Sequence, residues 1–405
     1  MTDILPPQAY QVSFSQSLTE IPAVQWNRLN RGNNPFCRHE FLLALEASDS
    51  VCAHTGWAPR HISVRDDQDQ LVAAIPTYLK SHSYGEYVFD WAWADAYQRH
   101  GLNYYPKLVS AIPFTPSVGP RILLADEVDA SAVFGAIEHA VTAYLDRRQL
   151  SGWHLLFPDT TSRLLAHPDR PLVNPGRTLV HQSQNSLQRQ GTQFHWHNHQ
   201  YQSFDHFLDH LTSRKRKNIR KERRKVIDAG AQFRWFEGDN ISDEVLKNFY
   251  QFYQMTYFKR GQQPYLQPAF FHQVRDTMPE NMLLLQADYQ QRPVAGALFF
   301  KGSDTLYGRY WGCVEEFDQL HFECCYYQGI EYAIAHQMTL FDAGAQGEHK
   351  IMRGFEPIPT YSLHWIQQPQ FRQAIADFLE QEKQGVDAYM ADAATILPYK
   401  TPQGA

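Results

Sequence analysis

The sequence has few cysteines, and their placement argues against a fold held together by disulfides. The 405 residues include five cysteines, at Cys37, Cys52, Cys313, Cys324 and Cys325. An odd number without any Cys-x-x-Cys pair does not suit a disulfide framework. We therefore expect reduced thiols and a cytoplasmic protein.

Long apolar runs are also missing. The longest, such as 294–300, are far shorter than the roughly 20 residues that a membrane-spanning helix needs. The N-terminus has no basic region followed by an apolar core, so we expect no signal peptide. With 43% hydrophobic residues and a mean hydropathy of −0.49, the chain has the composition of a soluble globular protein without stable membrane insertion. Its length suits two domains of ordinary size.

Positive charge is scarce overall, because the formal net charge is −6, but it is dense in one stretch. The basic residues of this stretch, which we call the basic strip, are Arg214, Lys215, Arg216, Lys217, Arg220, Lys221, Arg223, Arg224 and Lys225. Leu211, Ile219 and Val226 fall on one narrow helical face. With Ser203 as N-cap and Gly230 as a stop, the pattern predicts a helix over 204–229. The strip is either a solvated face or, as we favour, a binding surface for phosphates of a coenzyme, a nucleotide-linked substrate or tRNA.

Five short matches in the same order indicate an internal duplication. The matched pairs are 31–36 with 260–265, 72–75 with 294–297, 84–87 with 307–310, 136–141 with 329–334, and 194–196 with 363–365. The offset shrinks between the third and fourth pairs, which places an extra segment near 91–123 of the first copy. We expect an N-terminal domain at 1–200, a C-terminal domain at 201–368 that opens with the basic helix, and a helical tail at 369–405.

Each copy shows the same order of expected elements, which predicts an α/β (α+β) fold with mixed central sheets flanked by helices. The expected strands of the first copy are 10–14, 61–65, 71–79, 87–91 and 153–157, and those of the second are 232–236, 282–287, 293–301, 305–311 and 339–342. A long amphipathic helix is expected at 130–146 in one copy and at 320–337 in the other.

Several motifs resemble those of FemAB-like and CelD-like acyltransferases. They are the helix segment Arg216-Lys-Asn-Ile-Arg-Lys221, the strand and loop at 340–350, and the segments 349–357, 113–116 and 83–90. The likeness is greatest to a bacterial group of N-acyltransferases described in terms of peptidoglycan biosynthesis or recognition, and it covers nearly the whole chain from Asn34. It implies two acyltransferase domains of the GCN5-related (GNAT) fold in tandem, and transfer of an acyl or aminoacyl group to an amine.

The resemblance points to the loop after the expected strand 339–342 as part of the reaction channel. It implies that Lys350 lies in the channel, where Lys350 and the backbone from Gly344 to Gly347 would stabilise the oxyanion. Asp342 ends the strand before the loop, and His349 stands where the family usually has an aromatic residue, so His349 is a candidate base. Arg353, in the motif that follows, is a candidate for substrate contact. A solvated strand connection is the simpler alternative.

Two further candidates follow from the strand and the helix before this loop. Arg309 and Trp311 share a strand face, and an arginine between aromatic residues is expected to line a channel or to form an ion pair, with Glu323 as one possible partner. Glu323, early in the helix, is a candidate general base or a structural partner.

The first copy lacks the glycines and the lysine of this loop, so we expect one active site, in the second copy. The first copy is expected to bind the acceptor, through Glu86, Asp90 and Arg121. His195, His197 and His199, with His181 nearby, have a spacing that suits zinc, but a His-Trp pair in both copies favours packing, and we expect no metal.

The donor is not fixed by the sequence. No Q/R-x-x-G-x-G/A loop for a coenzyme A pyrophosphate is present, which favours aminoacyl-tRNA or an unusually held acyl-CoA as cosubstrate, with no bound cofactor. The interpretation is therefore an N-acyltransferase that acts on an amine, with a cell-wall precursor as one candidate acceptor. The alternative is a protein that binds tRNA or another polyanion without catalysis. The oligomeric state cannot be inferred from the sequence.

Overall fold

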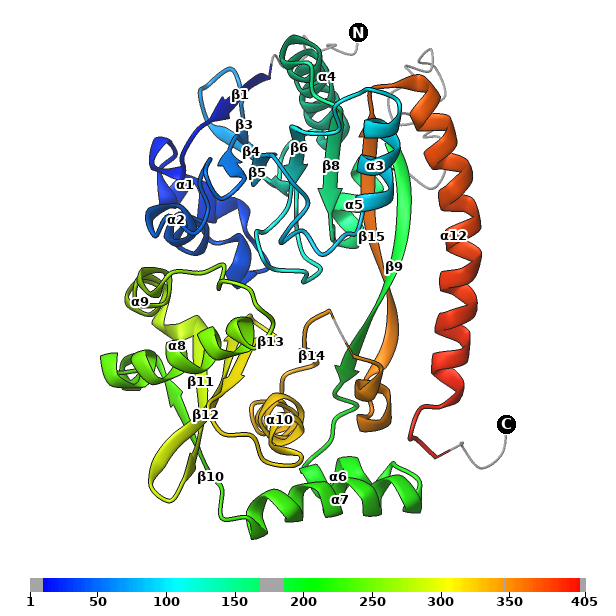
Figure 1. The fold of residues 1–405 in the computed structure, drawn as a ribbon. Helices are drawn as coiled ribbons and strands as arrows, with labels where there is room; N and C mark the ends of the chain where they lie inside the picture. Colours follow the sequence, from blue (N-terminus) through cyan, green and yellow to red (C-terminus); the bar gives the residue numbers. More distant parts are fainter. Residues whose placement is uncertain (1–9, 168–185, 346, 401–405) are drawn as a thin grey trace, which may run out of the picture. The chain divides into compact units, whose positions relative to one another are not determined.

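The computed structural model describes residues 10–167, 186–345 and 347–400, and the chain divides into two compact units (Figure 1). Unit 1 comprises Met1–Gly191 and Thr360–Gly385, and unit 2 comprises Thr192–Pro359 and Val386–Ala405. The expected domains were continuous, whereas each unit takes its residues from two separate stretches of the chain. No helix in the described residues has both the length and the apolar composition needed to cross a membrane.

Unit 1 contains two sheets. One has the order β1-β3-β4-β7, and the other strands of the unit follow the order β15-β8-β6-β5-β2. Their bounds are β1 (Gln11–Ser15), β2 (Trp57–Pro59), β3 (His61–Arg65), β4 (Leu71–Ile75), β5 (Thr77–Lys80), β6 (Lys107–Ser110), β7 (Leu123–Leu124), β8 (Gly152–Leu156) and β15 (Glu356–Ile366). The helices are η1 (Leu18–Glu20), α1 (Ala23–Leu29), η2 (Pro35–Cys37), α2 (His39–Ala47), α3 (Trp91–Arg99), α4 (Ala130–Arg148), α5 (Thr160–Ala166) and the first part of α12 (Pro369–Thr395).

Unit 2 has the strand order β10-β11-β12-β13-β14-β9. The bounds are β9 (Ser186–His197), β10 (Gln232–Glu237), β11 (Met282–Tyr289), β12 (Arg292–Lys301), β13 (Thr305–Cys313) and β14 (Leu340–Asp342). The helices are α6 (Phe204–Asp209), α7 (Ser213–Asp228), η3 (Gly238–Asn240), α8 (Asp243–Phe258), α9 (Pro268–Thr277), η4 (Pro279–Asn281), α10 (Leu320–Phe322), the π-helical turn η5 (Glu323–Tyr327), α11 (Gln328–Ala335) and η6 (Glu348–Arg353).

The strand registers support the duplication. In unit 2, β13 runs parallel to β14, and β14 pairs antiparallel with β9 so that Trp196 lies opposite Phe341. In unit 1, β6 runs parallel to β8, and β8 pairs antiparallel with β15 so that Trp365 lies opposite Trp153. The two His-Trp pairs are therefore equivalent, and the predicted tandem α/β fold is confirmed.

The same registers correct one of the five sequence matches. The strand predicted at 87–91 is wrong, because these residues form a loop and the start of α3. The strand equivalent to β13 is β6, so the extra segment lies between β5 and β6 rather than at 91–123. Leu306 pairs with Phe341 and Leu108 pairs with the equivalent Trp153. Counting three residues on from each leucine, the counterpart of Arg309 is Ala111 and not Glu86.

The strand predicted at 71–79 is in fact two strands, β4 and β5, which belong to different sheets. They meet at Pro76, which has no N–H to donate to a ladder, and its carbonyl accepts a hydrogen bond from Ala111 at 3.2 Å. The apolar alternation continues across this break, so it could not reveal the change of sheet.

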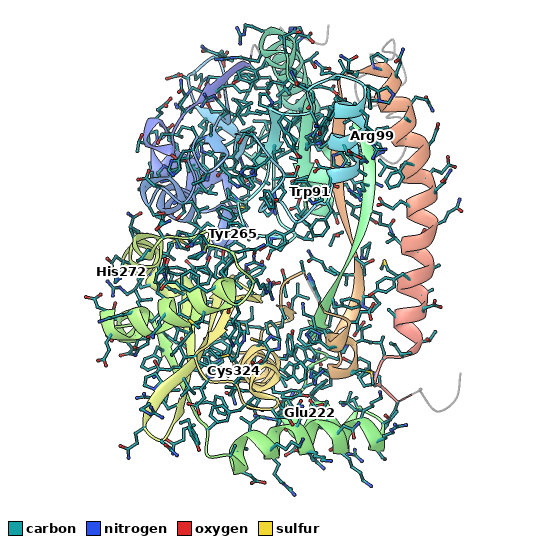
Figure 2. The ribbon with its side chains drawn as sticks, in the orientation of Figure 1. Trp91, Arg99, Glu222, Tyr265, His272 and Cys324 are labelled. Carbon is teal, nitrogen blue, oxygen red and sulfur yellow. The ribbon has the colours of Figure 1, made fainter. Side chains whose placement is uncertain are left out.

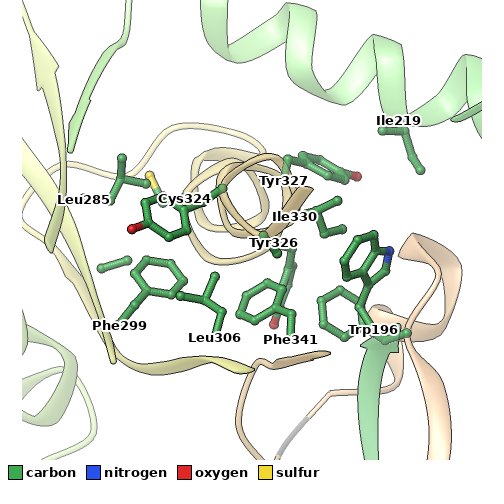
Figure 3. Packing of buried hydrophobic residues seen from close by; sticks show 14 of the residues in the cluster. Trp196, Ile219, Leu285, Phe299, Leu306, Cys324, Tyr326, Tyr327, Ile330 and Phe341 are labelled. Carbon is green, nitrogen blue, oxygen red and sulfur yellow. The ribbon is translucent and has the colours of Figure 1, made fainter. Parts of the chain in front are cut away.

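The core of unit 2 forms where the segment α10–η5–α11 covers its sheet (Figure 3). Tyr326, Tyr327 and Ile330 of this segment belong to the same buried cluster as Phe299 of β12 and Phe341 of β14. Burial of each such large side chain contributes roughly 1.5–3 kcal/mol. This packing fixes the helical segment against the sheet that carries the candidate site.

The helix predicted over 204–229 is two helices, α6 and α7, separated at 210–212. Ser203 caps α6 by accepting a hydrogen bond from the His206 N–H, and Gly230 follows α7 with a φ of 91°. The break has a tertiary cause. Leu211 is fully buried and forms a β-bridge with Tyr399, and the Thr212 N–H donates to Pro398 O at 2.9 Å.

Candidate functional site

A cavity lies in unit 2 where β13 and β14 stop pairing. Their last paired residues are Tyr307 and Asp342. Just beyond, Phe299 of β12 faces Gly308 whereas Leu298 faces Tyr310, so Arg309 is an extra residue in a β-bulge. A bulge redirects side chains at such positions. The resulting cavity of about 130 Å³ is lined by Leu298, Phe299, Arg309, Trp311, His321, Cys325, Tyr326 and Ala343, among others.

A larger hollow adjoins this cavity, because both are lined by Trp311 and His321. It measures about 540 Å³ and also contains Lys259, Arg260, Glu316 and Asp318 in its wall. The structure therefore places the predicted residues Arg309 and Trp311 together in the lining of a small cavity, and Trp311 also lines the larger, charged hollow of the same unit.

Lys350 is a buried cation in η6, the segment that follows the predicted loop. Its side chain is 1% exposed, and Nζ donates a hydrogen bond to the Gly344 carbonyl. Burial lowers the pKa of Lys350 to about 8, against the opposing effect of Asp342. The ammonium form therefore predominates at neutral pH, although deprotonation requires only a moderate rise in pH.

The loop from Asp342 to Lys350 depends on its glycines. Gly344 and Gly347 have φ values of 83° and 114°, and a Cβ at Gly347 would lie 2.3 Å from the His349 ring. The Gly344 N–H donates to Asp342 Oδ1 at 2.8 Å, and His195 Nε2 lies 3.6 Å from the same oxygen. The predicted oxyanion donor Gly344 N–H is thus engaged by Asp342, and residue 346 of the predicted loop lies outside the described residues.

Two histidines lie close to the cavity. The Tyr326 hydroxyl and His349 Nε2 are 2.7 Å apart. Burial lowers the pKa of His349, and the nearby positive charges of Arg353 and Lys350 lower it further. His321 lines both cavities, and burial together with His349 and Arg353 lowers its pKa to about 4. It is therefore neutral at pH 7. Sequence reasoning missed His321, because no motif surrounds it and only the fold brings it beside Trp311.

Glu323, which the sequence analysis named as one possible partner of Arg309, pairs with Arg223. Glu323 is 1% exposed and receives hydrogen bonds from the Arg223 guanidinium at 2.8–3.2 Å, while Arg223 also binds Glu331. Arg223 is reached because α7 passes over η5 and α11. This ion-pair network favours a structural role for Glu323 rather than that of a base.

A second link joins α7 to η6 through Glu222, which Figure 2 labels. Arg353 donates to Glu222 at 2.7 Å and to the His349 carbonyl at 2.7 Å, and its guanidinium lies 3.5 Å from the centre of the Phe322 ring. Arg353 is 5% exposed. These contacts hold the residue that was predicted to bind substrate inside the protein, where it positions the segment with His349 and Lys350.

The cations of the basic strip separate into two sets. One set is already bound: Arg216 to Asp209, Arg220 to Asp205, Arg223 to Glu323 and Glu331, Lys225 to Asp318, and Lys215 to the sulfur of Met352. The other set is Arg214, Lys217, Lys221 and Arg224, which are exposed and have no ion-pair partner in the described part of the chain. Their spacing of three, four and three residues places them along one side of α7. We call this set the cationic stripe.

The residues predicted to bind acceptor in the first copy are buried instead. Glu86, Asp90 and Arg121 are 3%, 2% and 1% exposed. Lys107, itself fully buried, donates to Glu86 at 2.8 Å and to Asp90, while Arg121 donates to the carbonyls of Leu156 and Ser117. Side chains that are used in this way inside unit 1 are not available to a ligand, so their role is structural.

The described residues contain no group of His, Cys, Asp and Glu side chains placed to hold a metal ion. His195 faces Asp342 across β9 and β14, and His197 and His199 have ring centres 6.4 Å apart. His181 lies outside the described residues.

Comparisons with known proteins place the chain in a family. A search of curated protein sequences gives no match. Among solved structures, the C-terminal domain of a putative lysylphosphatidylglycerol synthetase from Agrobacterium fabrum is similar, with a TM-score of 0.52 and 7% identity over 90% of this chain and 97% of that one. FemX (TM-score 0.46, 13% identity, 82% and 93% covered) and L-PGS from Bacillus licheniformis (0.48, 10%, 82% and 92%) are also similar. The model of the FemAB-like family, described as peptidoglycan biosynthesis/recognition, matches residues 17–401. The chain therefore belongs to the FemAB-like family.

Proposed function

We propose that unit 2 transfers an acyl or aminoacyl group from a phosphate-bearing donor to an amine. One observation carries this proposal: the buried Lys350 of η6 interacts electrostatically with Arg309 and Cys325, which line the small cavity beyond the last paired residues of β13 and β14. A cation in a site of low polarity stabilises an oxyanion more strongly than one in water does. Membership of the FemAB-like family agrees with this chemistry.

The reaction that we propose is attack of the amine nitrogen on the donor carbonyl carbon. A C–N bond forms, and the carbonyl oxygen becomes an oxyanion next to the Lys350 ammonium. The attacking nitrogen gives up its proton to His321, which is neutral at pH 7 and lines both cavities. Collapse of the intermediate breaks the ester or thioester bond of the donor, and the leaving oxygen or sulfur takes up the proton that His321 accepted, which restores the neutral imidazole. The cavity of about 130 Å³ would hold a small acyl or aminoacyl group.

The cationic stripe supports a donor with several phosphates. Arg214, Lys217, Lys221 and Arg224 extend over roughly 15 Å of helix, because each residue adds about 1.5 Å. A surface of this length fits a nucleic-acid backbone better than one pyrophosphate, which favours aminoacyl-tRNA over acyl-CoA. As part of the proposal, the reaction takes place in the cytoplasm and the acceptor is an amine of a peptidoglycan precursor.

Donor binding tests the proposal directly. Acyl-CoAs, charged tRNA and uncharged tRNA are titrated against the wild type and a Lys217→Ala/Lys221→Ala/Arg224→Ala variant, with Arg216→Ala/Arg220→Ala as the matched control from the same helix. The proposal expects saturable binding of one donor that the first variant weakens and the control largely keeps. It also expects acyl transfer to an amine, which Lys350→Met should slow by about 10²–10³-fold.

A protein that only binds polyanions is the second candidate, and the cationic stripe is the observation that favours it. Such a protein would bind charged and uncharged tRNA equally, with affinity falling steeply as salt rises, and would show no transfer to amines. That combination of results would refute the transferase proposal.

A further inference from the structure

Unit 1 contains a cavity that the proposed reaction does not use. It measures about 320 Å³ and lies beside α4, with Glu138, Val141, Leu145, Trp153, Trp365 and Arg372 among its lining residues. Trp153 and Trp365 are stacked with ring centres 4.1 Å apart. The walls are thus largely apolar and aromatic, with a carboxylate at one side and a guanidinium among the lining groups.

The carboxylate of Glu138 is only partly satisfied. Its side chain belongs to a residue that is 8% exposed, and Oε1 accepts a hydrogen bond from Trp365 Nε1 at 3.0 Å. Within the described residues, Oε2 has no hydrogen-bond partner and no cation pairs with the group. Burial raises the pKa of Glu138. A buried carboxylate without a cation is costly, and a ligand that supplied one would relieve the cost.

The duplicated fold shows which partner the equivalent carboxylate has in the other copy. The segment 136–141 matches 329–334 in sequence, so the counterpart of Glu138 on α4 is Glu331 on α11. Glu331 receives two hydrogen bonds from the Arg223 guanidinium, at 2.9 and 2.7 Å. In unit 2 the helices that follow β9 bring this cation to the carboxylate. In unit 1 the helix that follows β15 is α12, and a cavity lies beside Glu138 instead.

We propose that the unit 1 cavity binds an organic cation, namely an ammonium or guanidinium group on a short apolar stem. The cation pairs with Glu138 in the way Arg223 pairs with Glu331, and the stem packs on the indole of Trp365 and on Leu145. A cation close to an indole ring gains further stabilisation from the ring electrons. Arg372 is the one cation of the lining, so the ligand ammonium lies at the Glu138 end. This inference does not rest on the proposed transferase activity.

The test uses the full chain labelled with ¹⁵N at tryptophan. The indole N–H signal of Trp365, assigned with Trp365→Phe, is followed during titration with butylammonium, butylguanidinium and, as a neutral control, 1-butanol. We expect saturable shifts with both cations and weaker binding of the alcohol. Glu138→Gln keeps an acceptor for the Trp365 N–H but removes the charge, and should weaken cation binding about tenfold or more.

Glu127→Gln is the matched control, because Glu127 is an exposed carboxylate of the same unit. It should leave the affinity unchanged. The proposal is overturned if neither cation shifts the Trp365 signal, if Glu138→Gln binds the cations as the wild type does, or if 1-butanol binds equally well. A dispersed Trp365 signal in Glu138→Gln without ligand shows that the variant is folded, so loss of binding then reports on the charge alone.

Discussion

Replacement of Lys107 by methionine should strongly destabilise unit 1. Lys107 is fully buried, and its ammonium donates to Ser83 at 3.0 Å, to Glu86 at 2.8 Å and to Asp90. Burial would lower the pKa of Lys107, but Asp90 and Glu86 raise it to about 12. Methionine fills similar space but removes the ammonium that binds both buried carboxyl groups. Loss of one partner from a buried ion pair costs about 3–5 kcal/mol, and we expect a loss of this size.

The pH dependence provides the sharper test. In the wild type, burial raises the pKa of Glu86 from its ordinary value of 4.5 to about 7, so its protonated form favours folding and this contribution is lost as pH rises from 4.5 to 7. Lys107 opposes the effect of burial and holds the pKa of Asp90 well below its usual range. Without Lys107, both carboxyl groups prefer the protonated form. The variant should therefore recover part of its stability on acidification from pH 8 to pH 5.

Urea unfolding followed by tryptophan fluorescence measures both effects. A loss of 3–5 kcal/mol corresponds to a decrease in the unfolding midpoint of roughly 1–2 M. Lys383→Met, at an exposed lysine of the same unit, is the control and should change the stability by less than about 0.5 kcal/mol. A loss below about 1 kcal/mol, or a loss that is independent of pH, would refute the reasoning.

Three further predictions concern unit 2 and α12. Lys350→Met should lower kcat by about 10²–10³-fold. Wild-type activity should fall as the pH rises through about 8, because Lys350 then loses its proton. If the variant kept the same fall in activity at alkaline pH, Lys350 would not be the group that stabilises the oxyanion. Arg223→Leu should destabilise the protein by about 3 kcal/mol, because Glu323 is left buried without its ion-pair partner. Arg224→Leu should keep the stability but reduce the slope of log binding constant against log salt concentration, measured for a polyanion, by about one. Equal effects of the two variants in unfolding and binding assays would contradict the division of the basic strip into two sets. Gly312→Ala should destabilise the protein by about 3 kcal/mol, because the added Cβ would lie 1.8 Å from the Phe252 carbonyl oxygen. Gly385→Ala, in an open part of α12, is the control and should leave the stability unchanged or raise it in the same thermal unfolding measurement.

Local patterns in the sequence predicted most of the fold. Apolar alternation found nearly every strand of unit 2, and the repeated His-Trp pair located equivalent positions on β9 and β15. These features depend on neighbours along the chain, which the sequence displays. The break at Pro76 and the three-residue gap between α6 and α7 depend on contacts with distant segments, which local sequence patterns do not reveal.

The candidate site was predicted in part, for the same reason. The loop with Lys350 and the strand with Arg309 are brought into one unit, as the motifs suggested. Period-two reasoning could not reveal that Arg309 occupies a bulge, and helical periodicity could not reveal the π-helical turn at Glu323–Tyr327. The partner of Glu323 comes from a helix a hundred residues earlier, a pairing that charge alone could not select among nine basic residues.

The composition of unit 1 from two stretches has a consequence for its synthesis. Trp365, which stacks on Trp153, lies in the stretch that follows Pro359, so the ribosome must first produce the main part of unit 2. At about 5–20 residues per second, the N-terminal stretch waits some 10–30 s before its last strand exists. During that interval the edge of β8 and the Trp153 ring have no partner from β15. We expect a chaperone that binds nascent chains to bind this exposed edge during that interval. A ribosome pause before residue 366 would lengthen the interval.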